Sequence, residues 1–219
     1  MGRGYWHPPY ILRLQEYWTM LSGGTGQLYG NANTWWIGGN WLNELDTTGV
    51  TQLGYGTKLF SAYPWYNLVP DQNHTVVTAG YGTFVAAMPL LSNNSYVTAA
   101  STSDGQLAMA SIPMQETITV DLSQLSGQVT ASWYDPTLGT YTAVSGSPFA
   151  NSGTMQFTPP GTHSDGAADW VLVLRANSGS GSGSGSGLGS GGSSPGGRAC
   201  SGLQTSAPGK ANIDGSCAR

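Results

Sequence analysis

The sequence predicts a mainly β protein, in which an antiparallel β-sandwich follows a helix-strand-helix unit and precedes a disordered Gly/Ser tail. Three observations support this fold class. Helical periodicity is confined to residues 9–60, short β-type runs separated by turn residues fill residues 75–174, and the composition changes to Gly and Ser after Asn177. We therefore expect four parts in the chain, residues 1–70, 71–177, 178–197 and 198–219.

Residues 9–22 form the first predicted helix. Its apolar side chains recur at spacings of three and four residues until Gly23 and Gly24 end the pattern, as in an amphipathic helix. We expect this helix to pack against one sheet of the sandwich through Leu14, Trp18 and Leu21. Glu16 lies opposite this apolar stripe, so we expect its carboxylate to be solvated.

A short apolar piece and a second helix complete the first part. Gln27-Leu28-Tyr29 is a predicted strand, and a loop rich in Gly, Asn and Trp covers residues 30–40. Thr48 is the predicted N-cap of the second helix, which ends before Pro64 and directs four side chains inward: Val50, Leu53, Leu59 and Phe60. Two helices and one strand cannot bury their own apolar faces. They are typical of the last unit of a (β/α)8 barrel, whose earlier strands we expect to lie outside this chain.

From His74 onward the pattern is that of short strands. In residues 129–134 apolar and polar side chains alternate, which predicts one buried and one solvated face. Ser103-Asp104-Gly105 and residues 135–139 have the composition of hairpin turns, so an antiparallel sandwich is expected. The predicted strands are residues 75–79, 84–88, 96–101, 107–112, 117–122, 129–134, 140–144, 155–158 and 170–174.

The composition limits the partners of this chain. Its 219 residues include 7 Lys and Arg against 11 Asp and Glu, which gives a net charge of -4. This balance provides no basic surface for the backbone of a nucleic acid or for an anionic membrane. No run approaches the roughly 18 to 20 apolar residues that span a bilayer. We therefore expect neither nucleic acid nor a membrane as a partner.

The loop after Tyr29 would lie at the C-terminal rim of a barrel, where barrel active sites lie. Tyr29, Asn31, Trp35 and Trp36 would then face a pocket. Aromatic faces and an amide suit a carbohydrate, because its C–H groups stack on rings and its hydroxyls need fixed hydrogen-bond partners. In the alternative interpretation, these tryptophans are simply packed in a core.

No two carboxyl groups are convincingly placed for glycoside hydrolysis, which needs a pair about 5 to 10 Å apart. Glu44 and Asp46 are two residues apart and would point to different faces of a helix. Five aspartates lie in turns or at strand ends, where Asp has structural uses: Asp104, Asp121, Asp135, Asp165 and Asp169. The loop from Asp165 to Asp169 is far from a full calcium ligand set. We therefore predict no catalytic residue, no metal site and no cofactor in this chain.

Both cysteines lie beyond the Gly/Ser linker of residues 178–197. Cys200 and Cys217 bracket a polar stretch with too few apolar residues for a core, and a disulfide between them is our preferred interpretation. Two unpaired thiols in a disordered tail are the alternative, and the tail has no His with which to complete a zinc site. We interpret residues 198–219 as the start of a truncated module.

The order and spacing of several segments resemble a known family. Residues 13–31, Trp35-Trp36, Leu45-Asp46 and residues 64–71 resemble the end of the catalytic barrel in apiosidase-like glycoside hydrolases. The second half is similar to the β-sandwich that follows this barrel, which is labelled a collagen-binding domain of a collagenase. That similarity runs through residues 96–100, 104–110, 117–122, 133–136, 157–160 and 169–174.

The resemblance implies a barrel whose paired acids lie upstream, with Tyr29, Asn31 and Trp35 at its rim. We therefore expect a C-terminal fragment of a secreted glycoside hydrolase that acts on plant or microbial polysaccharide. The fragment alone would be monomeric and inactive, and its own N-terminus lacks the apolar stretch of a signal peptide. The alternative is a non-catalytic module that binds carbohydrate or collagen. Exposed sandwich tryptophans would favour binding, whereas buried Trp133 and Trp170 would favour a sandwich that braces the barrel.

Overall fold

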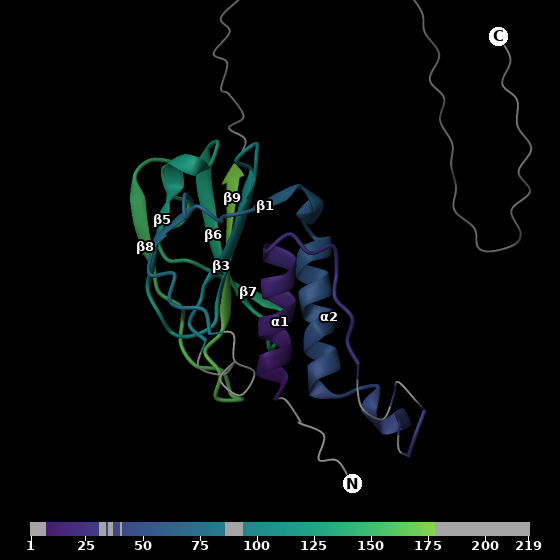
Figure 1. Cartoon of the computed structure of the whole chain (residues 1–219). Coiled ribbons are helices and arrows are strands. Elements are labelled where there is room, and N and C mark those ends of the chain that lie inside the picture. The colour runs from purple at the N-terminus through teal and green to yellow at the C-terminus, as the bar shows by residue number, and fades with distance from the viewer. Residues whose placement is uncertain (1–7, 31–33, 35–36, 40, 86–93, 178–219) are drawn as a thin grey trace, which may run out of the picture. The chain divides into compact units, whose positions relative to one another are not determined.

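The chain forms three layers, which are a pair of α-helices, a six-stranded sheet and a three-stranded sheet (Figure 1). The computed structural model describes residues 8–30, 34, 37–39, 41–85 and 94–177. Contacts divide the chain into Met1–Ser180 and Gly181–Arg219, and all described residues belong to the first of these units.

The first helix, α1 (Pro9–Leu21), confirms the prediction for residues 9–22. Proline at its first positions suits a helix start, because the missing N–H would have no partner within the helix. Gly23 ends the helix with a φ of 90°, a conformation that favours glycine. No helix among the described residues is both long and apolar enough to cross a membrane.

The second helix, α2 (Thr48–Ser61), begins one residue before the predicted helix start. Thr47, and not Thr48, is its N-cap, and the Thr47 hydroxyl accepts a hydrogen bond from the Val50 N–H at 3.5 Å. Short 3-10 helices lie on either side of α2, at Trp41–Glu44 and at Trp65–Asn67.

The two helices run parallel to each other (Figure 1). Leu12 lies beside Gly49, Arg13 bonds to Gln52 at 2.6 Å, and further along both helices Glu16 lies against Gly56. The two glycines allow this close approach, because a Cβ at either position would collide with a side chain of α1. Parallel helices that follow one another in the chain need a returning segment between them. Residues 22–47 form this segment.

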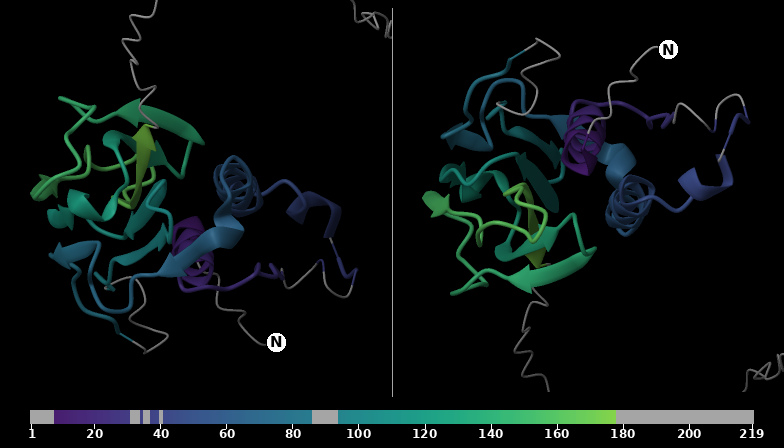
Figure 2. Two further views of the ribbon diagram at one scale, coloured as in Figure 1. Left: turned by 90° about the horizontal axis from the view of Figure 1, so that it is seen from above. Right: turned by 90° about the horizontal axis from the view of Figure 1, so that it is seen from below.

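The prediction of a strand at Gln27-Leu28-Tyr29 is wrong for this structure, which assigns no strand there. Leu28 is fully exposed, with a relative accessibility of 101%. A strand needs a neighbour to receive its backbone hydrogen bonds, and no described strand lies beside this piece. Figure 2 shows the segment extending away from the sandwich, beyond the helix pair.

All strand pairs in both sheets are antiparallel, as predicted. The large sheet has the order β1-β3-β4-β9-β6-β7, with strands β1 (Leu68–Pro70), β3 (Thr98–Thr102), β4 (Leu107–Ile112), β9 (Trp170–Asn177), β6 (Gln128–Asp135) and β7 (Thr140–Ala143). The small sheet has the order β2-β5-β8, with strands β2 (Val77–Ala79), β5 (Ile118–Asp121) and β8 (Thr154–Phe157).

Two differences from the predicted strands concern the edges of the sandwich. Phe84 and Val85 are not in a strand, and the rest of the predicted run over residues 84–88 lies outside the described residues. Strand β1 was not predicted, because its three residues are too few to show alternation and end in proline. It pairs with β3 at an edge of the large sheet, where proline is tolerated.

Apolar side chains fill the space between the two sheets, as a sandwich requires. Trp133 and Trp170 belong to this core, with exposed fractions of 5% and 8%. The Trp170 indole N–H also donates to the Gly161 carbonyl at 2.7 Å. Burial of these two tryptophans favours a sandwich that braces a barrel over one that uses them to bind a ligand.

A second core lies between the large sheet and the helices. Tyr17 and Leu21 of α1 and Leu59 and Phe60 of α2 pack there, against sheet residues that include Met109, Tyr134, Val171 and Val173. Tyr134 was expected on a solvated face, but α2 covers it and its hydroxyl donates to the Tyr55 carbonyl at 2.7 Å. Figure 2 shows the helices covering one face of the large sheet.

The predicted docking of α1 is confirmed for Leu21. Leu21 is fully buried in the core under the helices, whereas Leu14 packs with Ile11 in a separate cluster. Trp18 packs beside that separate cluster, and its indole N–H donates to the Tyr96 carbonyl of the sandwich at 3.3 Å. The helix therefore meets the sheet mainly through its C-terminal half.

Candidate functional site

Of the four predicted rim residues, the structure describes Tyr29 alone. The Tyr29 ring is partly exposed, with an accessible fraction of 36%. Asn31, Trp35 and Trp36 lie outside the described residues, so a carbohydrate site at the rim stays a prediction. The same holds for a disulfide between Cys200 and Cys217.

Glu16 corrects the prediction of a solvated carboxylate, because it is only 5% exposed. Its carboxyl lies against Gly56 of α2, and Oε2 has no hydrogen-bond partner among the described residues. Burial raises the pKa of Glu16 to about 8, so the carboxyl is mostly protonated at pH 7. The apolar stripe of α1 indicated the face that meets the sheet but not the second face, which meets α2.

The neighbouring Tyr17 is also buried without a partner for its hydroxyl among the described residues. Burial, and to a lesser extent the nearby Glu16, raises the pKa of Tyr17 well above its ordinary value. A cavity of about 240 Å³ adjoins Glu16. Its lining comes from both helices, the returning segment and the residue after Pro64: Glu16, Met20, Gly26, Gln27, Thr57, Phe60, Ser61 and Trp65.

Arg13 is the centre of a buried ionic network that the sequence analysis missed. Its guanidinium is fully buried and donates to both carboxylate oxygens of Asp169 at 2.8 Å and to Asp165 Oδ2 at 3.1 Å. Burial alone would lower the pKa of Arg13, but Asp169 and Asp165 raise it. The two aspartates therefore neutralise a cation from α1. Among the described residues there is no group of three or more His, Cys, Asp or Glu that could hold a metal ion.

His163 extends this network within the sandwich. One ring nitrogen, Nδ1, lies 3.4 Å from Asp135 Oδ2, and the other, Nε2, lies 2.6 Å from the Asp169 carbonyl oxygen. The His163 ring also packs on Trp170, with a centroid distance of 4.5 Å. The network links α1, the β6–β7 turn and the loop before β9, so its geometry is that of a structural connection.

The remaining sandwich aspartates have the structural uses that their turn positions predicted. Asp104 and Asp121 accept hydrogen bonds from the residues that follow them. The Thr102 hydroxyl lowers the pKa of Asp104, and the Ser123 hydroxyl lowers that of Asp121.

A row of aromatic rings lies beside the start of the sandwich. The His74 ring stacks on Tyr81 with centroids 3.8 Å apart, and further ring contacts connect Tyr96, Phe84 and Trp18. His74 has a φ of 53°, which is uncommon for a residue other than glycine. Phe84 is 56% exposed, so part of this row is open to solvent.

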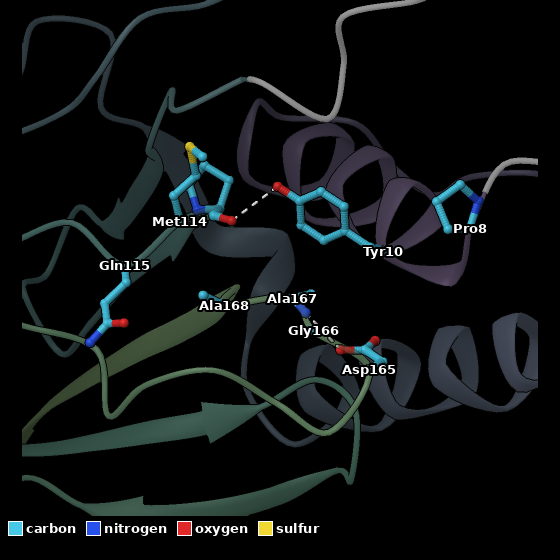
Figure 3. Close-up of a pocket in the computed structure, with 9 residues that line it drawn as sticks. Pro8, Tyr10, Met114, Gln115, Asp165, Gly166, Ala167 and Ala168 are labelled. Carbon is cyan, nitrogen blue, oxygen red and sulfur yellow. Dashed lines mark hydrogen bonds between the residues drawn. The ribbon is translucent and has the colours of Figure 1, made fainter.

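A cavity of about 360 Å³ lies where the start of α1 meets two loops of the sandwich (Figure 3). The Tyr10 hydroxyl donates to the Pro113 carbonyl at 3.0 Å. Burial, and then the charge of Asp169, raises the pKa of Tyr10 to about 12, so the hydroxyl keeps its proton. The lining residues are Pro8, Tyr10, Pro113, Met114, Gln115, Asp165, Gly166, Ala167 and Ala168.

The sandwich resembles a known protein family. Residues 85–175 match the family described as "Putative collagen-binding domain of a collagenase". No protein of curated function matches the chain.

Two solved structures share the fold of both the sandwich and the helices. One, named "Glycoside hydrolase", matches 78% of this chain and 38% of its own length, with a TM-score of 0.65 and 22% identity. A glycoside hydrolase family 5 structure from Bacteroides vulgatus ATCC 8482 matches 77% of this chain and 36% of its own length, with a TM-score of 0.62 and 21% identity. The sandwich is therefore similar to that family over residues 85–175, and the chain shares its fold with part of two structures that are named as glycoside hydrolases. The chain spans well under half the length of either structure.

Proposed function

We propose that this chain is the C-terminal part of a glycoside hydrolase, in which the two helices complete a (β/α)8 barrel and the sandwich braces that barrel. One observation carries the proposal: α1 and α2 run parallel and seal the outer face of the large sheet through Tyr17, Leu21, Leu59 and Phe60. This arrangement leaves the opposite side of the helix pair for barrel strands.

The returning segment supports this arrangement. In a barrel, the chain between two neighbouring helices contains a strand that is buried on both faces. Here Leu28, Ile37 and Leu42 of the returning segment are highly exposed. Burial against further strands would remove these apolar side chains from water, which is favourable by about 25 cal/mol per Å².

The proposal assigns the catalytic acids to the barrel and not to this chain. The described sandwich aspartates are engaged in turns or in the Arg13 network, and the Glu16 carboxyl is enclosed between two helices. The whole enzyme would act outside the cell, as a monomer, on plant or microbial polysaccharide. The 219-residue chain alone would not hydrolyse it.

The test compares two products of the gene. The longest open reading frame that contains this chain, and the 219-residue chain alone, are each assayed for reducing-sugar release from arabinoxylan, β-glucan and pectin. We expect activity from the longer product only. A longer product without activity, or a reading frame without strand-helix units before Met1, would contradict the proposal.

A second candidate function is a non-catalytic module that binds carbohydrate or collagen. The family match over residues 85–175 favours it, and the exposed part of the aromatic row is suited to stacking on a ligand. The test is a pull-down of the 219-residue chain with insoluble polysaccharide and with collagen. Binding of the wild type, together with weaker binding of the Phe84→Ala variant, would support this function.

A further inference from the structure

We infer that the cavity between α1 and the sandwich loops binds a carbohydrate chain that extends from the barrel, an inference that rests on the proposed function. The cavity lies at the N-terminal end of α1. In a βα unit the helix begins at the end of the barrel where the strands finish, which is the end that carries active sites. The cavity therefore opens at the proposed catalytic end of the molecule.

The walls of the cavity are held in fixed positions. Tyr10 is fixed by its hydrogen bond to the Pro113 carbonyl at 3.0 Å, and Asp165 by Arg13 at 3.1 Å and by the Ala167 N–H at 3.0 Å. Arg13, which is itself fully buried, also lies 5.9 Å from the centre of the Tyr10 ring. A ligand would therefore meet a site that is largely formed in advance, which lowers the entropic cost of binding.

The side chains that face the cavity are those that recognise a sugar. Figure 3 shows the Tyr10 ring on one side of residues 166–168, with Gln115 and Asp165 at either end of them. The ring offers an apolar face for C–H groups, and the Gln115 amide makes no hydrogen bond to the part of the chain that the structure describes. Asp165 adds acceptor capacity at the opposite end of residues 166–168. Together they provide one stacking surface with both donors and acceptors for hydroxyl groups.

Size and shape also favour a sugar over a proline-rich or collagen-like peptide. The volume of about 360 Å³ lies within the range of small-molecule sites, roughly 300–1,000 Å³. Grooves for polyproline helices are lined by several aromatic side chains, whereas Tyr10 is the one aromatic side chain among the described residues that line this cavity.

The test measures binding by the 219-residue chain, which contains the whole cavity. Xylohexaose, cellohexaose, a pectic oligosaccharide and a triple-helical collagen peptide are the probes. Each is titrated against the wild type and against Gln115→Ala, Tyr10→Ala and Tyr10→Phe. Gln156→Ala is the matched control, because Gln156 is an exposed glutamine of β8, in the other sheet. We expect Gln115→Ala and Tyr10→Ala to weaken binding of at least one probe about fivefold to tenfold. Tyr10→Phe keeps the ring but loses the hydrogen bond to Pro113, so we expect it to weaken binding less than Tyr10→Ala does. The control should bind within about twofold of the wild type.

Three results would contradict a carbohydrate site in this cavity. The inference is overturned if no oligosaccharide binds, if Gln115→Ala binds as tightly as Gln156→Ala, or if a triple-helical collagen peptide is the only probe that binds. Gln115 is exposed, so its substitution leaves the core intact even if Tyr10→Ala fails to fold. If the oligosaccharides do not bind but the longer gene product hydrolyses polysaccharide, this inference is wrong and the proposed function stands. If the longer product has no activity, the proposed function itself is wrong.

Discussion

At the scale of single residues, Glu16 has the most unusual environment. A buried carboxyl group is costly to ionise inside a protein, and burial raises the pKa of Glu16 to about 8. The unfolded chain would release this proton near the ordinary value of 4.5, whereas the folded chain keeps it until about pH 8. The folded state therefore binds more protons between these values, and stability falls as the pH rises through this window.

Glu16→Gln removes this titration and should flatten the pH dependence. Relative to the wild type, we expect the variant to gain roughly 2–5 kcal/mol of unfolding free energy between pH 5 and pH 8.5. Urea unfolding followed by tryptophan fluorescence measures the difference at each pH. Glu116→Gln, outside the helix pair, is the control. Parallel pH curves for the wild type and Glu16→Gln would show that Glu16 ionises normally.

Arg13 should be the most sensitive charged residue to substitution. Arg13→Met leaves two aspartates without their cation, and removal of one partner from a buried ion pair costs about 3–5 kcal/mol. Arg175→Met changes an exposed arginine of β9 and should cost less than about 0.5 kcal/mol. Chemical unfolding of both variants at pH 7 tests this contrast, and equal midpoints would contradict the role assigned to Arg13.

At the scale of elements, the contact between α1 and α2 depends on the glycines of α2 that lie against α1, and Gly56 is the one that faces Glu16. Gly56→Ala places a methyl group on the Glu16 carboxyl, and overpacking of this kind costs about 1–3 kcal/mol. Gly54→Ala, two residues earlier in the same helix, meets open space and should stabilise by about 0.5–1 kcal/mol through helix propensity. Thermal unfolding of the two variants should therefore show shifts of opposite sign. Shifts of the same sign would mean that the two helices are not in close contact at Gly56.

Individual strands and helices also show how much of the fold the sequence can predict. Strand β4 was predicted with its observed bounds, because its β-type residues are bounded by turn residues. The predicted strand at Leu28 was wrong because a segment's own pattern does not reveal whether a neighbouring strand is present. Glu16 and Arg13 were missed for a related reason, since the pattern of one helix does not show which partner covers its polar side. The rim residues Asn31, Trp35 and Trp36 remain a prediction.

At the scale of the whole molecule, the helices and the sandwich share one core and should be protected together. We expect backbone amides in α1 and α2 to exchange with solvent as slowly as those of β4 and β9. Residues 25–30 of the returning segment lie outside any helix or strand, and their amides should exchange far faster. Native-state hydrogen exchange with mass spectrometry separates these segments. Rapid exchange throughout α1 and α2 would contradict a joint core.

Strand β1 has a further consequence for the large sheet, because its outer edge has few donors to offer to another strand. The Asp71 N–H points inward, to the Ala99 carbonyl of β3, so the alternate residues Leu68 and Pro70 face outward. The Leu68 N–H already donates to the Trp65 carbonyl, and Pro70 has no N–H. An additional strand would find no backbone donor at either position, which protects this side of the sheet from growing by edge-to-edge aggregation.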